Sequence, residues 1–220
     1  MKMIIDGKKV DSVSKETFDV IAPATGIVVD NVPKATAEDI EKAVTAAVKG
    51  QKEWEKFSVT ERADVLYKFI DIVELNKESL AQTLCAENGK PITEARAEIG
   101  NIKIAFRAFA EHAKHYYGSI IPPGTEAGQE NHIQMVTREP IGVVACIIPF
   151  NFPCDLYDRK VAPALMMGNA AIVLPSSDKE SNRDKVVVMF TDGIPTSLRE
   201  FEYGVASSAI ANSATLKKDN

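Results

Sequence analysis

The sequence is poor in cysteine, with three among 220 residues, and none of them stands in a Cys-x-x-Cys pair. An odd number at this spacing does not fit a disulfide framework and gives no sign of a zinc site. We therefore interpret Cys85, Cys146 and Cys154 as reduced thiols and predict no metal centre. The chain also lacks a Walker A loop and a Gly-x-Gly-x-x-Gly motif, so no short motif by itself assigns a nucleotide site.

Long apolar runs are missing as well. No stretch reaches the roughly 18 apolar residues of a membrane span, and the start, MKMIIDGKK, has charges where a secretory signal needs its apolar core. The formal net charge of −5 provides no basic footprint, so neither nucleic acid nor an anionic membrane is an expected partner. With 45% apolar residues, the sequence predicts a globular cytoplasmic protein with a sizeable core.

The N-terminal residues carry two hairpin signals. Asp6-Gly7 stands between short extended runs within residues 4–10. A Pro-Ala-Thr-Gly turn then separates two extended runs between Phe18 and Pro33. We expect four short strands here.

Helical periodicity follows these strands. Thr36, with Asp39 three residues on, resembles a capping box and predicts the start of a first helix. Ser58 is a second cap candidate, before apolar residues at helical spacing, and a third helix is expected after that one. The segment from Pro91 keeps helical periodicity for about seven turns and is predicted to end at Gly118.

The pattern changes after residues 131–140, which have the partial alternation of an exposed strand. IGVVACIIPF (141–150) and NAAIVLP (169–175) are continuous apolar runs joined by a short helical stretch. This is typical of a strand–helix–strand unit with parallel strands buried on both faces. Ligands of such sheets bind at the carboxyl ends of the strands. Asn151, on a turn with a proline on each side, is therefore a candidate ligand-binding residue.

Four segments resemble sequence motifs of the aldehyde dehydrogenase family, in the family's order and spacing. They are ENGKP at 87–91, REPIGVV at 138–144, PFNFP at 149–153 and APALMMGNA at 162–170. The resemblance runs from the N-terminus to about Asp178 and looks like the branch that uses lactaldehyde or succinate semialdehyde. For residues 1–178 it implies an α/β fold, with an incomplete Rossmann-like parallel sheet, helices and small β oligomerisation strands.

The resemblance also implies roles for single residues. In this family an aldehyde is oxidised to a carboxylic acid with NAD or NADP, through attack of a cysteine thiolate on the aldehyde. The side-chain amide of Asn151 would donate to the resulting oxyanion, where a preorganised hydrogen bond is worth most. Ile148, Pro149 and Phe150 would lie along the cofactor, and Ser176 would lie near the adenosine ribose.

Two features depart from the family pattern. The family commonly has Lys-Pro-Ser-Glu after the second strand, where the lysine binds the adenosine ribose, whereas this chain has Leu174-Pro175-Ser176-Ser177. Leucine cannot donate that hydrogen bond, so the choice between NAD and NADP stays open. The family's catalytic cysteine, general-base glutamate and glycine-rich turn lie beyond the point where the resemblance stops. Cys154 has nothing nearby in the sequence to lower its pKa, and we interpret it as inert.

The tail from residue 179 to 220 has a different character. Residues 178–185, DKESNRDK, contain no apolar residue, and they are too few for the crossover that a further parallel strand needs. The last strand therefore pairs differently or belongs to another unit. The segment with VVVMFTDG resembles a fragment of a von Willebrand factor A domain, in which Asp192 would match a metal ligand, but the rest of that ligand set is missing. We expect an unrelated or rearranged tail.

Three interpretations remain open at this point. The first is an N-terminal, cofactor-binding part of an aldehyde dehydrogenase that alone cannot oxidise its small aldehyde substrate. The second is a non-catalytic oligomerisation or regulatory module that forms a homo-oligomer through residues 131–140. The third is a fusion product without a selected function.

Overall fold

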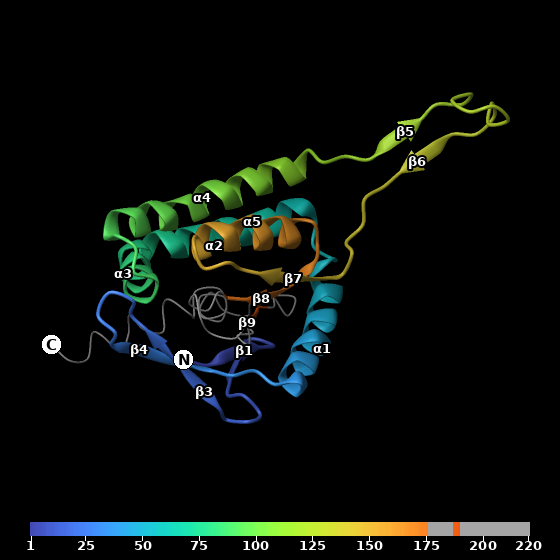
Figure 1. Cartoon of the computed structure of the whole chain (residues 1–220). Helices are drawn as coiled ribbons and strands as arrows, with labels where there is room; N and C mark the ends of the chain where they lie inside the picture. The colour runs from blue at the N-terminus through green and yellow to red at the C-terminus, as the bar shows by residue number, and fades with distance from the viewer. Residues whose placement is uncertain (176–186, 190–220) are drawn as a thin grey trace.

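The computed structural model describes residues 1–175 and 187–189 and shows a mixed α/β architecture. Figure 1 shows helices on one side of a small sheet, N-terminal hairpins on the other side, and a two-stranded arm that extends away from the body. The predicted α/β class is confirmed. Within the residues that the structure describes, no helix has the length and apolar character needed to cross a membrane.

Both predicted N-terminal hairpins are present. β1 (Met3–Ile5) pairs antiparallel with β2 (Lys8–Val10), and β3 (Thr17–Ile21) pairs antiparallel with β4 (Val28–Pro33). The first turn places Asp6 and Gly7 at φ of 54° and 69°. An Asp-Gly pair suits a turn with two positive φ values, which is why the sequence signal was specific.

The first two helices begin where the caps predict, and the third helix follows the second as expected. They are α1 (Ala37–Trp54), α2 (Val59–Leu75) and α3 (Lys77–Asn88). Thr36 and Asp39 form a complete capping box at the start of α1, and Ser58 and Glu61 form another at the start of α2. Each box satisfies backbone N–H groups that the helix itself leaves free, which fixes the start of the helix.

The fourth helix is shorter than predicted. α4 (Ile92–Lys114) ends with His115 as its C-cap, so the prediction that it ends at Gly118 is wrong. The reason for a glycine at position 118 is a close backbone approach: a Cβ there would lie 2.0 Å from the carbonyl oxygen of Val136. Gly118 thus belongs to the base of the arm and not to the helix terminus.

The arm is a separate two-stranded sheet. β5 (Ser119–Ile121) pairs antiparallel with β6 (Gln134–Val136), and the loop between them stands far from the body (Figure 1). The exposed strand predicted within residues 131–140 is confirmed as β6.

A strand–helix–strand unit forms the remaining sheet. β7 (Val143–Ile147) and β8 (Ala170–Leu174) are parallel and are joined by α5 (Pro153–Met166), as predicted. β9 (Val187–Met189) pairs antiparallel with β8, so the order is β7-β8-β9. The antiparallel pairing corresponds to the first of the two alternatives that the sequence leaves open, in which the last strand pairs differently from the parallel strands before it.

One prediction about this sheet is wrong. β7 is not buried on both faces: Cys146 and Ile148 face the core, whereas Ala145 is exposed and Ile147 is 60% exposed. Side chains alternate between the two faces of a strand. Within the part of the chain that the structure describes, one face of β7 is therefore exposed to solvent.

The core lies between the helices and the sheet. α4 packs against α5 and α2, and the rings of Phe69 and Phe106 meet with centroids 4.8 Å apart. α1 and α5 both contact β7 and β8. This packing fixes the start of α5, and with it the loop that precedes α5.

Candidate functional site

The loop between β7 and α5 presents several side chains at the carboxyl end of a parallel strand. The backbone N–H of Ile148 donates to the carbonyl of Leu174 over 2.9 Å, which extends the pairing of β7 and β8 by one residue. The strand ends there. Phe150 and Phe152 are 42% and 48% exposed, and Asn151 between them is exposed too.

The predicted site residues divide by exposure. Pro149, Phe150 and Asn151 lie together on the exposed loop. Ile148 is only 4% exposed, so its side chain is part of the core and only its backbone can face a ligand. Ser176 lies outside the described residues.

Two residues of the ENGKP segment hold this loop. The side-chain amide of Asn88 donates to the carbonyl of Phe150 over 2.7 Å. The ammonium of Lys90 donates to the carbonyl of Asn151 over 3.0 Å and lies 4.5 Å from the centroid of the Phe152 ring. Two motifs that are far apart in the sequence are therefore in direct contact.

A buried carboxylate holds the start of α5. Glu98, on α4, accepts hydrogen bonds from the backbone N–H groups of Cys154 and Asp155 over 2.8 and 3.3 Å. Its other oxygen pairs with the Lys90 ammonium. A negative charge at a helix N-terminus is stabilised by the helix dipole and by the free N–H groups there. Sequence analysis missed Glu98, because a glutamate within a helix gives no sign of a distant partner.

The thiols near the loop are poorly suited to nucleophilic attack. Burial raises the pKa of the Cys154 thiol well above its ordinary value, and the nearby carboxylates of Glu98 and Glu87 raise it further. Burial also raises the pKa of the Cys146 thiol. Because the thiolate is the reactive form, these shifts support the interpretation of both residues as inert.

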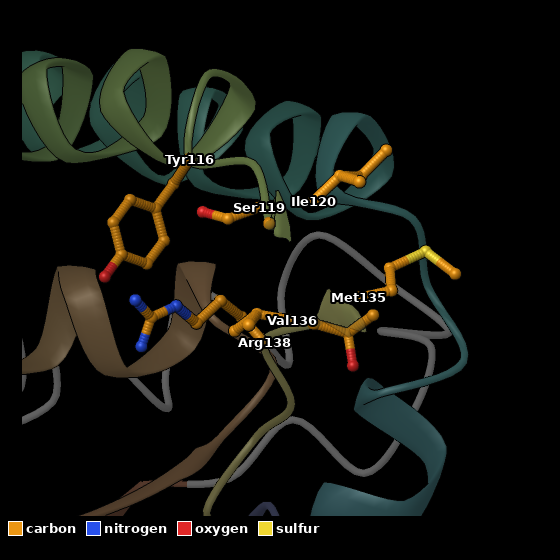
Figure 2. A pocket seen from close by; sticks show the side chains of 8 residues that line it. Tyr116, Ser119, Ile120, Met135, Val136 and Arg138 are labelled. Atoms are coloured by element: carbon orange, nitrogen blue, oxygen red, sulfur yellow. The ribbon is translucent and has the colours of Figure 1, made fainter. Parts of the chain in front are cut away.

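No metal centre is evident in the described part of the chain, where no group of three or more His, Cys, Asp or Glu side chains is arranged to hold an ion. A surface hollow of about 350 Å³ lies elsewhere, at the base of the arm. Figure 2 shows Tyr116 and Arg138 on one side of this hollow and Ile120 and Met135 on the other. It shares no lining residue with the loop after β7 and is not the candidate site.

Comparison with known proteins decides the family. Residues 9–214 match the Aldehyde dehydrogenase family. The chain belongs to this family. The match extends past residue 178 into the tail, and so covers more of the chain than the motifs do. The resemblance of the tail to a von Willebrand factor A fragment stays a prediction, and Asp192 lies outside the described residues.

Individual relatives agree with this assignment. The chain is 42% identical over 173 residues to a 3-sulfolactaldehyde dehydrogenase of Pseudomonas putida, covering 79% of this chain and 35% of that protein. It is 32% identical over 208 residues to a D-glyceraldehyde dehydrogenase (NADP(+)) of Thermoplasma acidophilum, covering 94% and 41%. The chain thus spans less than half the length of these two curated relatives.

The fold agrees as well. The structure is similar to the NADP-dependent glyceraldehyde-3-phosphate dehydrogenase of Bacillus halodurans C-125, complexed with NADP, with a TM-score of 0.77 and 32% identity. That likeness covers 80% of this chain and 37% of the other. The Rossmann-like character of the β7–α5–β8 unit is therefore shared with solved aldehyde dehydrogenases.

Proposed function

We propose that residues 1–220 act as the N-terminal, cofactor-binding part of an NAD(P)-dependent aldehyde dehydrogenase, and that these residues alone bind dinucleotide without completing aldehyde oxidation. The observation that carries the proposal is the exposed loop at residues 149–153. It lies at the carboxyl end of a parallel strand, where ligands of such sheets bind, and within the family match.

The residues at this loop fit a dinucleotide in part. Pro149 and Phe150 offer exposed apolar surface, and Ile148 offers its backbone. Leu174 ends β8 where the family commonly has a ribose-binding lysine, and it cannot replace that hydrogen bond. When bound, the cofactor would accept the hydride released by the aldehyde carbon. We expect weak binding through residues 148–150, with Ser176 near the adenosine ribose.

Asn151 is the catalytic candidate. Its side chain is exposed beside the loop's apolar residues, so its amide is free to donate to an oxyanion that forms on a bound aldehyde. Removing one such donor costs about 3 kcal/mol of transition-state stabilisation in acyl-transfer enzymes. The raised thiol pKa values of Cys146 and Cys154 support the other half of the proposal, that these residues alone supply no nucleophile.

The names of the relatives bear on the substrate and the cofactor. Two are dehydrogenases of small polar aldehydes, 3-sulfolactaldehyde and D-glyceraldehyde, and the second is NADP-dependent. A small aldehyde of this kind is the proposed substrate class for the complete reaction, in line with the lactaldehyde and succinate semialdehyde branch. The cytoplasm is the proposed location.

The arm favours a second candidate, a homo-oligomerisation module. Ile133 and Met135 in residues 131–140 are 73% and 74% exposed, and Ile120 on the facing strand is 70% exposed. Large apolar side chains gathered on a projecting hairpin are typical of an association surface. This candidate does not exclude the first, because the arm and the loop after β7 share no residues.

The origin of the tail, residues 179–220, is the subject of a separate proposal. We propose that residues 179–220 are a rearranged segment, a division that rests on the polar residues 178–185 and on the lack of aldehyde dehydrogenase motifs beyond them. The family match to residue 214 favours a tail derived from an aldehyde dehydrogenase.

Three measurements test these proposals. Calorimetric titration with NAD and with NADP should show saturable binding, whereas no heat with either would contradict the cofactor proposal.

An assay of NAD(P)H production with short aldehydes should show no turnover by the purified chain. Turnover that Cys154→Ala abolishes would make Cys154 a nucleophile. Size-exclusion chromatography decides the second candidate, because a defined oligomer without dinucleotide affinity would favour the module.

A further inference from the structure

The loop that carries Asn151 is fastened by residues that are outside the loop. Four backbone groups between Phe150 and Asp155 are engaged by polar side chains from the end of α3, from the connection that follows it and from α4. Asn88 donates to the Phe150 carbonyl, Lys90 donates to the Asn151 carbonyl, and Glu98 accepts from two N–H groups at the start of α5.

Lys90 and Glu98 form the centre of this arrangement. Their side chains are 7% and 1% exposed, and they pair with each other as well as with the loop. Burying two charges costs desolvation free energy, which a hydrophobic pair of similar size would avoid. A buried pair is therefore a poor device for stability alone, whereas its directional hydrogen bonds to one loop fix that loop's conformation.

The pair acts on both sides of Asn151. Lys90 holds the carbonyl of Asn151 itself and contacts the Phe152 ring, and Glu98 holds the first turn of α5 directly after Pro153. The exposed Asn151 side chain is thus carried on a backbone that is fixed before and after it. A donor that stabilises an oxyanion must be preorganised, because reorientation during the reaction would consume its benefit.

We propose that Lys90 and Glu98, assisted by Asn88, are positioning residues that order the loop at 150–155 and thereby orient the Asn151 amide. Their assigned role is to hold the backbone of the loop. The inference deepens the proposed function, on which the role of Asn151 rests, but the ordering of the loop can be measured without any ligand.

The test is the backbone order of the loop in the intact chain, measured by ¹⁵N relaxation. In the wild type, residues 150–152 should have order parameters near the value of about 0.85 that is usual for rigid backbone. Lys90→Met should lower them toward the flexible range, below about 0.6, while those of α1 and α2 stay unchanged. Unchanged order of residues 150–152 in a folded Lys90→Met variant would overturn the inference.

A conservative variant separates the hydrogen bonds from the charge. Glu98→Gln keeps an acceptor oxygen, so the amides of Cys154 and Asp155 should keep their protection from hydrogen exchange, whereas Glu98→Ala should raise their exchange rates at least tenfold. Equal protection in both variants would contradict the role of Glu98. Glu78→Gln is the matched control. It removes the ion pair between Glu78 and Arg96, a residue of α4 like Glu98, and should leave the loop unchanged.

Two further variants keep the test decisive if Lys90→Met fails to fold because it leaves Glu98 charged and unpaired. The double variant Lys90→Met, Glu98→Gln contains no buried charge at this site, and Asn88→Ala removes only the bond to the Phe150 carbonyl. Loss of loop order in either supports the inference, and wild-type order in both overturns it. Titration with NAD and NADP is read separately: a well-ordered wild-type loop that binds neither refutes the proposed function and leaves the positioning result intact.

Discussion

Asp158 is an acid in the core of the molecule. It is fully buried on α5, and neither carboxyl oxygen has a hydrogen-bond partner among the described residues. Burial raises its pKa from 3.8 to about 8; the Asp155 carboxylate raises it as well, while Arg159 lowers it. The side chain is therefore protonated in the folded protein at neutral pH, since an unpaired buried charge would cost far more than a neutral acid.

This acid predicts a pH dependence of stability. Between pH 4 and 8 the folded state holds a proton that the unfolded state has lost, so the free energy of unfolding should fall as the pH rises and level off above 8. At about 1.4 kcal/mol per pH unit over roughly four units, the upper bound is about 6 kcal/mol. Asp158→Asn should remove this fall in urea denaturation series, and the exposed Asp71→Asn should not. A variant with the wild-type pH profile would contradict the assignment.

Thiol reactivity gives a second prediction for single residues. Because their pKa values are raised, Cys146 and Cys154 should react with iodoacetamide at pH 8 at least tenfold more slowly in the folded chain than in urea. Peptide mass spectrometry reports each site separately. Labelling of Cys154 in the folded chain at its unfolded rate would show an activated thiol and would reopen the question of a nucleophile.

Sequence and structure agree unevenly for individual residues. Asn151 could be found in advance because a motif and the end of an apolar run coincide at it. The positioning roles of Lys90 and Glu98 could not be found, although Lys90 lies in the ENGKP segment, because the backbone groups that they hold in the loop are more than 50 positions away and every residue carries such groups. Asp158 was also invisible, since an aspartate on a helix is usually solvated and only the packing of α5 buries it.

The C-terminal end of α5 depends on side chains from two other helices. Two of its last carbonyls accept from buried side-chain donors: Trp54 donates to Leu165 over 2.8 Å, and Arg62 donates to Met166 over 3.0 Å. Arg62 also donates to the carbonyl of Phe57 over 2.7 Å. These bonds join α1, α2 and α5, and the bond from Arg62 satisfies the Met166 carbonyl, which the helix cannot satisfy itself.

Removing Arg62 should therefore weaken the whole assembly of helices. Arg62→Ala leaves the Met166 and Phe57 carbonyls without this donor, and hydrogen bonds to charged groups are worth about 1.5–3 kcal/mol each. We expect a loss of about 3 kcal/mol in the free energy of unfolding, measured by urea denaturation. Arg159→Ala is the control, because its exposed pair with Asp155 should contribute little. Equal effects of the two substitutions would contradict the account.

The arm depends on a glycine at its base. A Cβ at Gly118 would meet the carbonyl oxygen of Val136 at 2.0 Å, so Gly118→Ala should separate β5 from β6. Hydrogen exchange in residues 119–121 and 134–136 should become at least tenfold faster, while α4 and α5 stay protected. Ser119→Ala, at the next position, is the control and should leave the exchange rates of these two strands unchanged. If the amides of Gly118→Ala exchange as slowly as those of the wild type, the close approach of residue 118 to the Val136 carbonyl is not what requires a glycine there.

Elements were predictable where the signal is local. Capping boxes and the Asp-Gly turn act over three or four residues, and they gave the starts of α1 and α2 and the first hairpin. The end of α4 was misplaced because Gly118 serves a contact with Val136 that lies 18 positions away, a relation that only the structure contains. The open face of β7 was missed for the same reason, since an apolar run does not show what covers it.

At the scale of the whole molecule, the chain combines a Rossmann-like strand–helix–strand unit, an arm and a helical layer, and spans less than half the length of the relatives compared with it. The parallel pair and its loop are the parts on which the proposed function depends. The family match extends further along the chain than the motifs did.

The most direct test is to map dinucleotide binding on the ¹⁵N-labelled chain by titration with NADP and with NAD. The account predicts saturable chemical-shift changes that concentrate in residues 147–153 and in the neighbouring end of β8, with the arm residues 119–121 and 134–136 unaffected. The absence of changes at millimolar cofactor, or changes that concentrate on the arm, would contradict it.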